Sequence, residues 1–252
     1  MTFSFSSLST FHICKHQFKL TYLGDEVIRL PNFFSDYGLF VHEVFEEYFN
    51  GNLSEDELGE YFHKNYDLKV TNSPPAFIKE RPYIEQGQAF FNAWDFDLER
   101  FEPVIIEGTY SFKIGDTELT GRPDLVLHDL ETGDYILVDY KTSAPFRVDK
   151  RNGSVIRDKK KMDDYYKQMY IYAYAVREEA GFSIDSISII FPRLSRTETV
   201  NWTQEQEDET LDWVTQTITA IKEEEEFPPN TKSKFFCQQL CGVRDYCEYK
   251  PE

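Results

Sequence analysis

The stretch at residues 121–142, GRPDLVLHDLETGDYILVDYKT, most narrows what this chain can fold into. It holds two apolar runs, 125–127 and 135–138, joined by a turn that contains a glycine. Short apolar runs rich in β-branched residues around such a turn predict a β-hairpin. Asp124 opens the first run and Asp139 closes the second, so antiparallel pairing would bring both carboxylates to one end of the hairpin.

A lysine lies beside the two acids at that end of the hairpin. Lys141 follows Asp139 by two positions, so both side chains leave the same face of the strand. Two carboxylates favour Mg²⁺ or Mn²⁺, which keep positions open for water and phosphate oxygens. A neighbouring lysine can orient or deprotonate the water and hold the phosphate. The alternative interpretation is an edge hairpin whose charges are merely solvated.

The charge of the chain is strongly negative and unevenly distributed. A net charge of −18 argues against a protein that coats nucleic acid broadly. Residues 141–161, however, hold eight basic and two acidic residues, a local charge of +6, whereas residues 198–226 hold ten acidic residues and one basic residue, a local −9. A basic segment on an acidic protein can hold one nucleic-acid strand beside Asp124 and Asp139. We expect Arg147, Lys150 and Arg151 to contact phosphates there; the alternative is a flexible surface loop.

Length and composition predict one intracellular domain. The 252 residues include 22 Phe and 16 Tyr, enough aromatic side chains for a substantial core. No apolar run approaches the roughly 20 residues of a membrane span, and the first residues, MTFSFSSLSTF, lack the basic and apolar regions of a secretion signal. We therefore expect a cytoplasmic protein, in which the four cysteines do not form disulfides.

Hydrophobic periodicity predicts a helical region at residues 36–101 and a catalytic sheet and helix at residues 102–202. Helices are expected at residues 6–14, 36–50, 55–65, 81–101, 163–180 and 203–226. Strands are expected at residues 104–114, 184–192 and 198–202, and an extended segment at residues 18–23. Two polar side chains in these elements are candidates for the site. His42 lies within an apolar helix, where a hydrogen-bonded core histidine is the alternative to a metal ligand, and Glu107 lies mid-strand, where a rim charge is the alternative.

Pro123-Asp124 followed by Asp139-Tyr140-Lys141 resembles the signature of the PD-(D/E)XK nucleases, and GRPD at residues 121–124 resembles the RecB-like branch. The resemblance implies that His42, in a GxxxHxxxE pattern, is a third metal ligand and that Glu107 lies near the metal. It adds the main-chain carbonyl of Tyr140 as a further ligand and Arg122 as a contact to DNA. Gln168 and Tyr172, four apart on one helix face, match the Q-x-x-x-Y motif that positions DNA in this branch.

The cysteine spacing predicts a metal-binding site. Cys237, Cys241 and Cys247 fall within eleven residues, and Cys14 supplies a fourth sulfur. Four thiolates suit an iron–sulfur cluster or Zn²⁺, and spacing alone does not separate the two. One cysteine near the start and three in the tail resemble the iron–sulfur clasp of AddB-type and CRISPR-adaptation exonucleases, which implies a [4Fe–4S] cluster held by Cys14 and residues 230–252. The tail departs from the expected spacing, with C-x3-C in place of C-x2-C at Cys237.

Together these features predict an α/β, restriction-endonuclease-like core: a mixed central sheet flanked by helices, with a helical insertion and a C-terminal iron–sulfur lobe in one domain. The predicted function is a Mg²⁺- or Mn²⁺-dependent DNA nuclease, an exonuclease on single-stranded DNA acting in repair, recombination, phage replication or CRISPR adaptation. Lys141, Asp124, Asp139 and Glu107 are the catalytic candidates. The alternatives are a non-catalytic DNA-binding subunit and a nuclease that works only with a protein partner.

Overall fold

In the computed structural model the predicted hairpin forms the middle of a five-stranded sheet with strand order β10-β9-β6-β5-β2. The strands are β2 (Phe101–Ile106), β5 (Leu125–Asp129), β6 (Tyr135–Tyr140), β9 (Ser186–Phe191) and β10 (Arg196–Asn201). β6 and β9 run parallel and the other neighbours antiparallel, so the sheet is mixed. The structure describes residues 1–24, 28–143, 145–149, 151 and 155–251.

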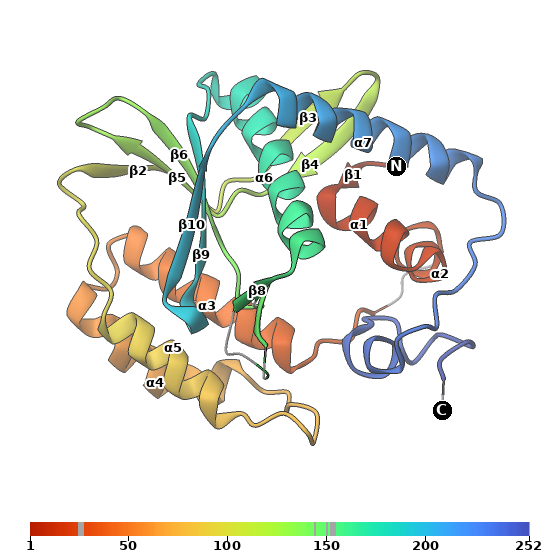
Figure 1. Cartoon of the computed structure of the whole chain (residues 1–252), viewed down its shortest axis with the longest axis horizontal. Coiled ribbons are helices and arrows are strands. Elements are labelled where there is room, and N and C mark those ends of the chain that lie inside the picture. The colour runs from red at the N-terminus through yellow and green to blue at the C-terminus, as the bar shows by residue number, and fades with distance from the viewer. Residues whose placement is uncertain (25–27, 144, 150, 152–154, 252) are drawn as a thin grey trace.

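Helices cover both faces of this sheet (Figure 1). One face carries α3 (Phe33–Phe49), α4 (Glu55–Lys69) and α5 (Arg81–Asn92), and the other carries α6 (Lys159–Ala180), α1 (Phe5–Ile13) and α7 (Gln204–Glu223). The period-two pattern of the hairpin divides its side chains between two cores: Val126 and Leu137 pack with α6, whereas Leu127 and Val138 pack with α3 to α5. This arrangement confirms the predicted α/β fold with a mixed sheet flanked by helices.

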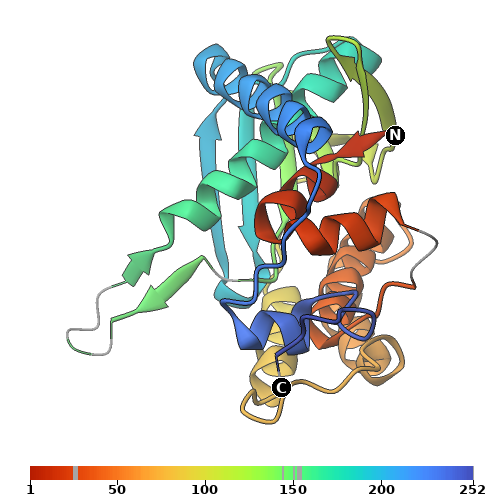
Figure 2. The ribbon, with the colours of Figure 1, turned by 90° about the vertical axis from the view of Figure 1, so that its right-hand side faces the viewer.

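Two smaller sheets contain the other strands of the described residues. β1 (Phe3–Ser4), β4 (Thr117–Gly121) and β3 (Tyr110–Ile114) form one of them, in the order β1-β4-β3. β7 (Phe146–Val148) and β8 (Val155–Arg157) pair antiparallel as a hairpin that extends away from the body of the protein (Figure 2). This hairpin leads directly into α6, which Asp158 caps by accepting a hydrogen bond from the backbone N–H of Lys161.

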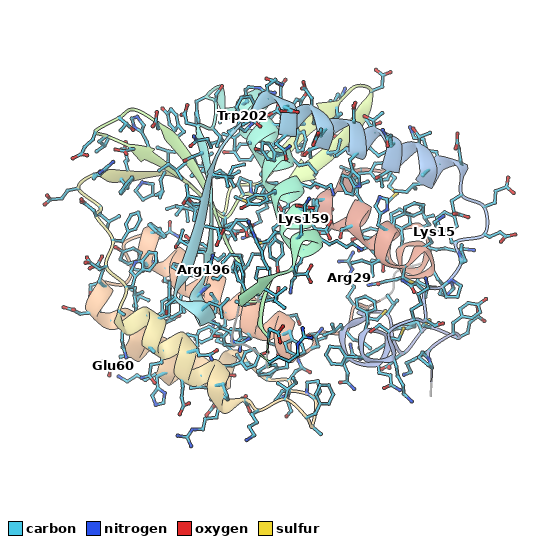
Figure 3. The ribbon with its side chains drawn as sticks, viewed as in Figure 1. Lys15, Arg29, Glu60, Lys159, Arg196 and Trp202 are labelled. Atoms are coloured by element: carbon cyan, nitrogen blue, oxygen red, sulfur yellow. The ribbon has the colours of Figure 1, made fainter. Side chains whose placement is uncertain are left out.

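The start of the chain lies against the C-terminal tail. After α1 come α2 (Lys15–Phe18) and a π-helix, η1 (Lys19–Leu23), and the tail contains a second π-helix, η3 (Phe236–Leu240). The Asn230 side chain donates to the carbonyl of Ile13 at 2.8 Å, and the backbone N–H of Leu30 donates to the carbonyl of Gly242 at 2.8 Å. Lys15, labelled in the right-hand part of Figure 3, pairs with Glu224.

The structure corrects three predicted elements. Residues 18–23 are helical and not extended, because Phe18 and Tyr22, one helical turn apart, pack with ring centroids 5.2 Å apart. The expected strand at residues 104–114 is two strands in two different sheets: the backbone breaks at Glu107, which adopts a positive φ of 49°. The expected helix at residues 81–101 ends at Asn92, and β2 begins at Phe101.

No helix among the described residues is long and apolar enough to cross a membrane.

An ion pair anchors the outer end of the hairpin. Arg100 Nη2 and Nε donate to the two oxygens of Asp129 at 2.7 and 3.1 Å, and these hydrogen bonds hold the pKa of Asp129 at about 2. Because the folded pKa lies below the unfolded value of about 3.9, this contribution to stability is present above pH 4 and is lost as the pH falls toward 2.

Asp129→Asn should therefore lower Tm at neutral pH, and the difference from wild type should shrink as the pH approaches about 2. Thermal unfolding followed by circular dichroism across this pH range measures it. Asp134→Asn, which changes an exposed acid in the same turn, is the matched control and should leave Tm nearly unchanged. A difference in Tm that does not depend on pH would contradict this account of the pair.

Candidate active site

The hairpin register brings the two predicted acids together. Leu125 pairs with Val138, so Asp124 and Asp139 come next in line at the same end of the ribbon. The backbone N–H of Tyr140 donates to Asp124 Oδ2 at 3.0 Å, which holds that carboxylate across the strands. Both acids are buried, with Asp139 only 1 % exposed. Two buried carboxylates at this spacing need a compensating cation or protons.

Helix α3, which packs on one face of the sheet, brings His42 next to Asp124. Asn32 caps the helix by accepting from the backbone N–H groups of Phe34 and Ser35, and the apolar stripe of α3 packs into the core. His42 Nε2 lies 2.9 Å from the carbonyl oxygen of Tyr140. This contact turns His42 Nδ1 toward the acids, 3.4 Å from Asp124 Oδ2 and 3.5 Å from an oxygen of Glu107.

Glu107 joins the site because the chain turns sharply there. Its positive φ follows the end of β2, and its backbone N–H donates to the carbonyl of Asp124 at 2.8 Å. One ligand atom from each of His42, Glu107 and Asp124 lies within 4.8 Å of the others, which is a spacing that a metal ion can bridge. Arg122 Nε lies 2.9 Å from the other oxygen of Glu107 and is 60 % exposed. Arg122 thus lies at the rim of the candidate metal site.

Lys141 connects the acids to α6. Its Nζ donates to Asp139 Oδ1 at 2.9 Å and to Gln168 Oε1 at 2.8 Å. Gln168 Nε2 in turn donates to the Tyr172 hydroxyl at 2.9 Å. A Cβ on Gly121 would lie 3.1 Å from Tyr172 Cδ1, so the glycine that opens GRPD makes room for the tyrosine. The predicted Q-x-x-x-Y pair and the predicted lysine therefore form one hydrogen-bonded chain.

Sequence reasoning missed Tyr165. Its ring centroid lies 5.4 Å from Lys141 Nζ, and its hydroxyl donates to the carbonyl of Ser143 at 3.0 Å. Tyr165 precedes Gln168 by three positions and therefore shares its helix face. That spacing is the signal that would have identified it.

The charges of the site shift one another's protonation. Burial and the nearby charge of Asp139 raise the pKa of Asp124 to about 7. Burial alone would lower the pKa of His42, but the charge of Asp124 and the contact with Glu107 outweigh it and raise that pKa to about 9. Burial likewise opposes the charge of Lys141, yet the two aspartates raise its pKa above the ordinary value. The buried acids thus favour positive charge on both His42 and Lys141.

The described contacts do not bring the predicted DNA contacts Arg147, Lys150 and Arg151 to the site. Arg151 is exposed and pairs with Asp149 at 2.9 Å. Arg147 lies on β7, and its side chain is outside the described part of the structure. Lys150 falls outside the described residues. The roles of these three residues in binding DNA stay predictions.

The four cysteines converge at one place. Cys14, Cys237, Cys241 and Cys247 all line one small cavity between α1, α2 and the tail. Cys14 Sγ accepts hydrogen bonds from the backbone N–H groups of Asn230 and Gln17, at 3.3 and 3.4 Å. Burial and the neighbouring cysteines raise the pKa of the Cys237 thiol. A bound metal cation would therefore be needed to keep the cysteines deprotonated as thiolates. The predicted fourth sulfur, 223 residues before the first tail cysteine in sequence, is therefore a neighbour in space.

Comparisons with known proteins agree with this geometry. The family model that matches, over residues 2–249, is that of the PD-(D/E)XK nuclease superfamily. A crystal structure of a protein from Eubacterium rectale, provisionally named an exonuclease, superposes with a TM-score of 0.53 at 13 % identity, over 100 % of this chain and 90 % of that one. The structure of SSO0001, at 14 % identity over 98 % of this chain and 100 % of that one, reaches a TM-score of 0.37, too low to support an argument. No curated protein matches significantly. The chain belongs to the PD-(D/E)XK nuclease superfamily.

Proposed function

We propose that this protein is a Mg²⁺- or Mn²⁺-dependent deoxyribonuclease that acts as an exonuclease on single-stranded DNA. The observation that carries the proposal is the convergence of His42, Glu107 and Asp124 within 4.8 Å, beside the ion pair of the buried Asp139 with Lys141. Membership of a nuclease superfamily supports hydrolysis of phosphodiester bonds as the reaction.

The donor atoms fit a hard divalent cation. Carboxylate oxygens are the ligands that Mg²⁺ and Mn²⁺ prefer, and an imidazole nitrogen in the set favours Mn²⁺ of the two. His42, Glu107 and Asp124 would hold the ion. Asp139 lies outside this group of three. Its buried Oδ2 lies 2.7 Å from Lys141 Nζ but accepts no hydrogen bond of good geometry, which leaves that oxygen available as the fourth ligand. The Tyr140 carbonyl accepts from His42 Nε2 and so orients the imidazole toward the acids. A bound ion supplies a water of lowered pKa and offsets charge at the phosphate.

Lys141 is the protein group that acts on the attacking water. Asp139 and Gln168 hold its Nζ from two sides, which fixes the direction of its remaining N–H. The raised pKa keeps the side chain an ammonium, so it orients water and stabilises phosphate charge as a cation. Gln168 and Tyr172 continue this chain of hydrogen bonds. Their proposed role is to position the DNA strand.

A cleavage assay on end-labelled linear and on circular single-stranded DNA tests the proposal, with Mn²⁺, Mg²⁺ or EDTA. We expect metal-dependent loss of the linear substrate only. Asp124→Asn keeps the hydrogen-bond acceptor for Tyr140 but removes the charge, and should reduce the rate at least about 10²-fold. Asp134→Asn, on the exposed turn of the same hairpin, should cleave like wild type. Cleavage of the circle would make the enzyme an endonuclease. No cleavage of either substrate by a folded sample would refute a nuclease that works alone and leave the partner-dependent and non-catalytic alternatives.

We further propose that the cysteine cavity holds a [4Fe–4S] cluster in a structural role. Zinc bound by thiolates at about 2.3 Å would space the sulfurs about 3.8 Å apart. Within the described chain no three cysteine sulfurs lie within 4.8 Å of one another, which favours a cluster that binds each thiolate to a separate iron. Backbone N–H donors to Cys14 Sγ add the hydrogen bonds that stabilise a ligated thiolate.

The same proposal places the enzyme in the cytoplasm, in DNA repair, recombination, phage replication or CRISPR adaptation, alone or with a protein partner. A non-catalytic DNA-binding subunit is the alternative, and the net charge of −18 does not separate the two, because it opposes broad DNA binding by either. Cleavage that appears only when a partner is added would assign the partner-dependent form.

A further inference from the structure

A second cavity lies directly beside the candidate active site. Thr142 and Ser143, the two residues after Lys141, form part of its wall, and its volume is about 470 Å³. The remaining wall comes from α3, α5, the start of α6, the 3₁₀ turn η2 (Pro192–Leu194), and Phe235 and Leu240 at the two ends of η3. None of the catalytic candidates lines this cavity, so the nuclease assignment leaves it without a role.

The wall of this cavity is rich in flat side chains. The Arg193 guanidinium lies 3.4 Å from the ring centroid of Tyr83, and its Nε donates to Gln86 at 3.1 Å, which fixes the plane of the group. Phe34 lies 6.2 Å from Tyr83 and 6.4 Å from Phe235, measured between ring centroids. Phe235 is 37 % exposed. A planar ligand could therefore stack against aromatic and guanidinium faces.

The lining of the cavity is positively charged, which favours a planar ligand that carries negative charge. Its lining includes Arg193 and Lys161 and contains no aspartate or glutamate among the described residues, although the chain carries a net charge of −18. A larger cavity of about 600 Å³ shares Phe235 with it and adds three lysines, Lys160, Lys167 and Lys232, with one acid, Asp164. Proteins bind unpaired nucleic-acid strands with flat side chains that stack on the bases and with basic side chains that follow the phosphate backbone.

We propose that the cavity formed by Phe34, Tyr83, Arg193 and Phe235 binds unpaired bases of the strand being cut, next to the scissile phosphate. The inference rests on the proposed nuclease function and deepens it by assigning the site that selects a single strand. Bases in a duplex are stacked on their neighbours and cannot enter such a cavity, whereas every unpaired base offers a flat face to stack. The ligand is recognised by stacking, so no base sequence is selected.

Binding to a strand with and without bases tests this proposal apart from cleavage. The cleavage-deficient Asp124→Asn protein is titrated, with Mg²⁺ present, into a labelled single-stranded oligonucleotide and into the same oligonucleotide with consecutive abasic sites. Fluorescence anisotropy gives both Kd values. We expect the strand that carries bases to bind about 10-fold more tightly. Phe235→Ala and Arg193→Ala should remove most of that preference, and Phe235→Trp, which keeps a flat ring, should retain it.

Phe77 is the matched control. It is 71 % exposed and contacts Phe235 at 5.5 Å, but it does not line the cavity, so Phe77→Ala should keep the preference. Arg193→Lys keeps the charge and loses the plane, and should behave like Arg193→Ala. Equal binding of the two oligonucleotides, or an unchanged preference in both alanine variants, would overturn the base-binding site. A base preference without any cleavage by wild-type protein would overturn the nuclease and leave the binding site standing.

Discussion

Alanine at position 141 should reduce metal-dependent cleavage by about 10²- to 10⁴-fold. Lys141 is the cation nearest the acids, held 2.7 Å from Asp139 Oδ2 and 2.8 Å from Gln168 Oε1, and no other lysine among the described residues pairs with either acid of the hairpin. Because its role requires a fixed charge at the attacking water, free amines in solution should restore little activity. Initial rates on linear single-stranded DNA at saturating Mn²⁺ measure the loss.

The same substitution should also destabilise the protein when metal is absent. Asp139 is 1 % exposed, so removing its partner leaves a buried carboxylate without compensation, which costs about 3–5 kcal/mol. Adding Mg²⁺ or Mn²⁺ should recover part of this loss, since the ion would supply the missing positive charge. Denaturant unfolding with EDTA and with metal separates the two states.

Lys113→Ala is the matched control for both measurements, because Lys113 is exposed on β3 and has no ion pair among the described contacts. It should retain activity and stability within about 0.5 kcal/mol. Full activity in Lys141→Ala would remove the lysine from the mechanism. Equal stability of Lys141→Ala with EDTA and with metal would show that the ion does not bind beside Asp139.

Serine at position 241 should remove the brown colour that the proposed [4Fe–4S] cluster would give the protein, and should sharply reduce the soluble yield. Cys241 is the most buried of the four cysteines, at 7 % exposure, and follows η3 in the tail that contacts the start of the chain. The binding free energy of a structural metal group is folding free energy, so losing one ligand should weaken the attachment of the tail to α1 and α2. Visible absorbance, iron and sulfide content, and limited proteolysis of the tail measure the effect.

Thr231→Ser is the control for this substitution, since Thr231 lines the same cavity and offers no sulfur. It should keep both colour and yield. A colourless wild-type protein with stoichiometric zinc would contradict the iron–sulfur assignment and leave the nuclease assignment intact. Normal colour in Cys241→Ser would remove that residue from the set of ligands.

The local pattern of the hairpin was sufficient to predict its strands and the meeting of its two acids. Both follow from period-two alternation and from pairing around a short turn, which are properties of neighbouring residues. The position of Lys141 beside Asp139 and the shared helix face of Gln168 and Tyr172 are local in the same sense. For these features the sequence needed no information about the rest of the fold.

Other predicted elements were wrong because local patterns compete. The apolar run that leads into Glu107 continues beyond it, so periodicity alone predicts one strand; the positive φ at Glu107 divides that run between two sheets. The aromatic residues at 18–23 suit a strand as well as a helix, and packing of Phe18 against Tyr22 decided for the helix. In each case a tertiary contact selected between two allowed local structures.

By itself, the sequence determined the fold class, the hairpin with its acids and lysine, and the residue types available for a metal site. Only the tertiary structure decided that His42 Nδ1 faces Glu107 and Asp124, that Tyr165 joins Lys141, and that Cys14 lies with the tail cysteines. The physical reason is the distance along the sequence between the residues that interact. Backbone pairing and helix periodicity act between residues close in sequence, whereas these contacts depend on how α3, α6 and the tail pack around the sheet.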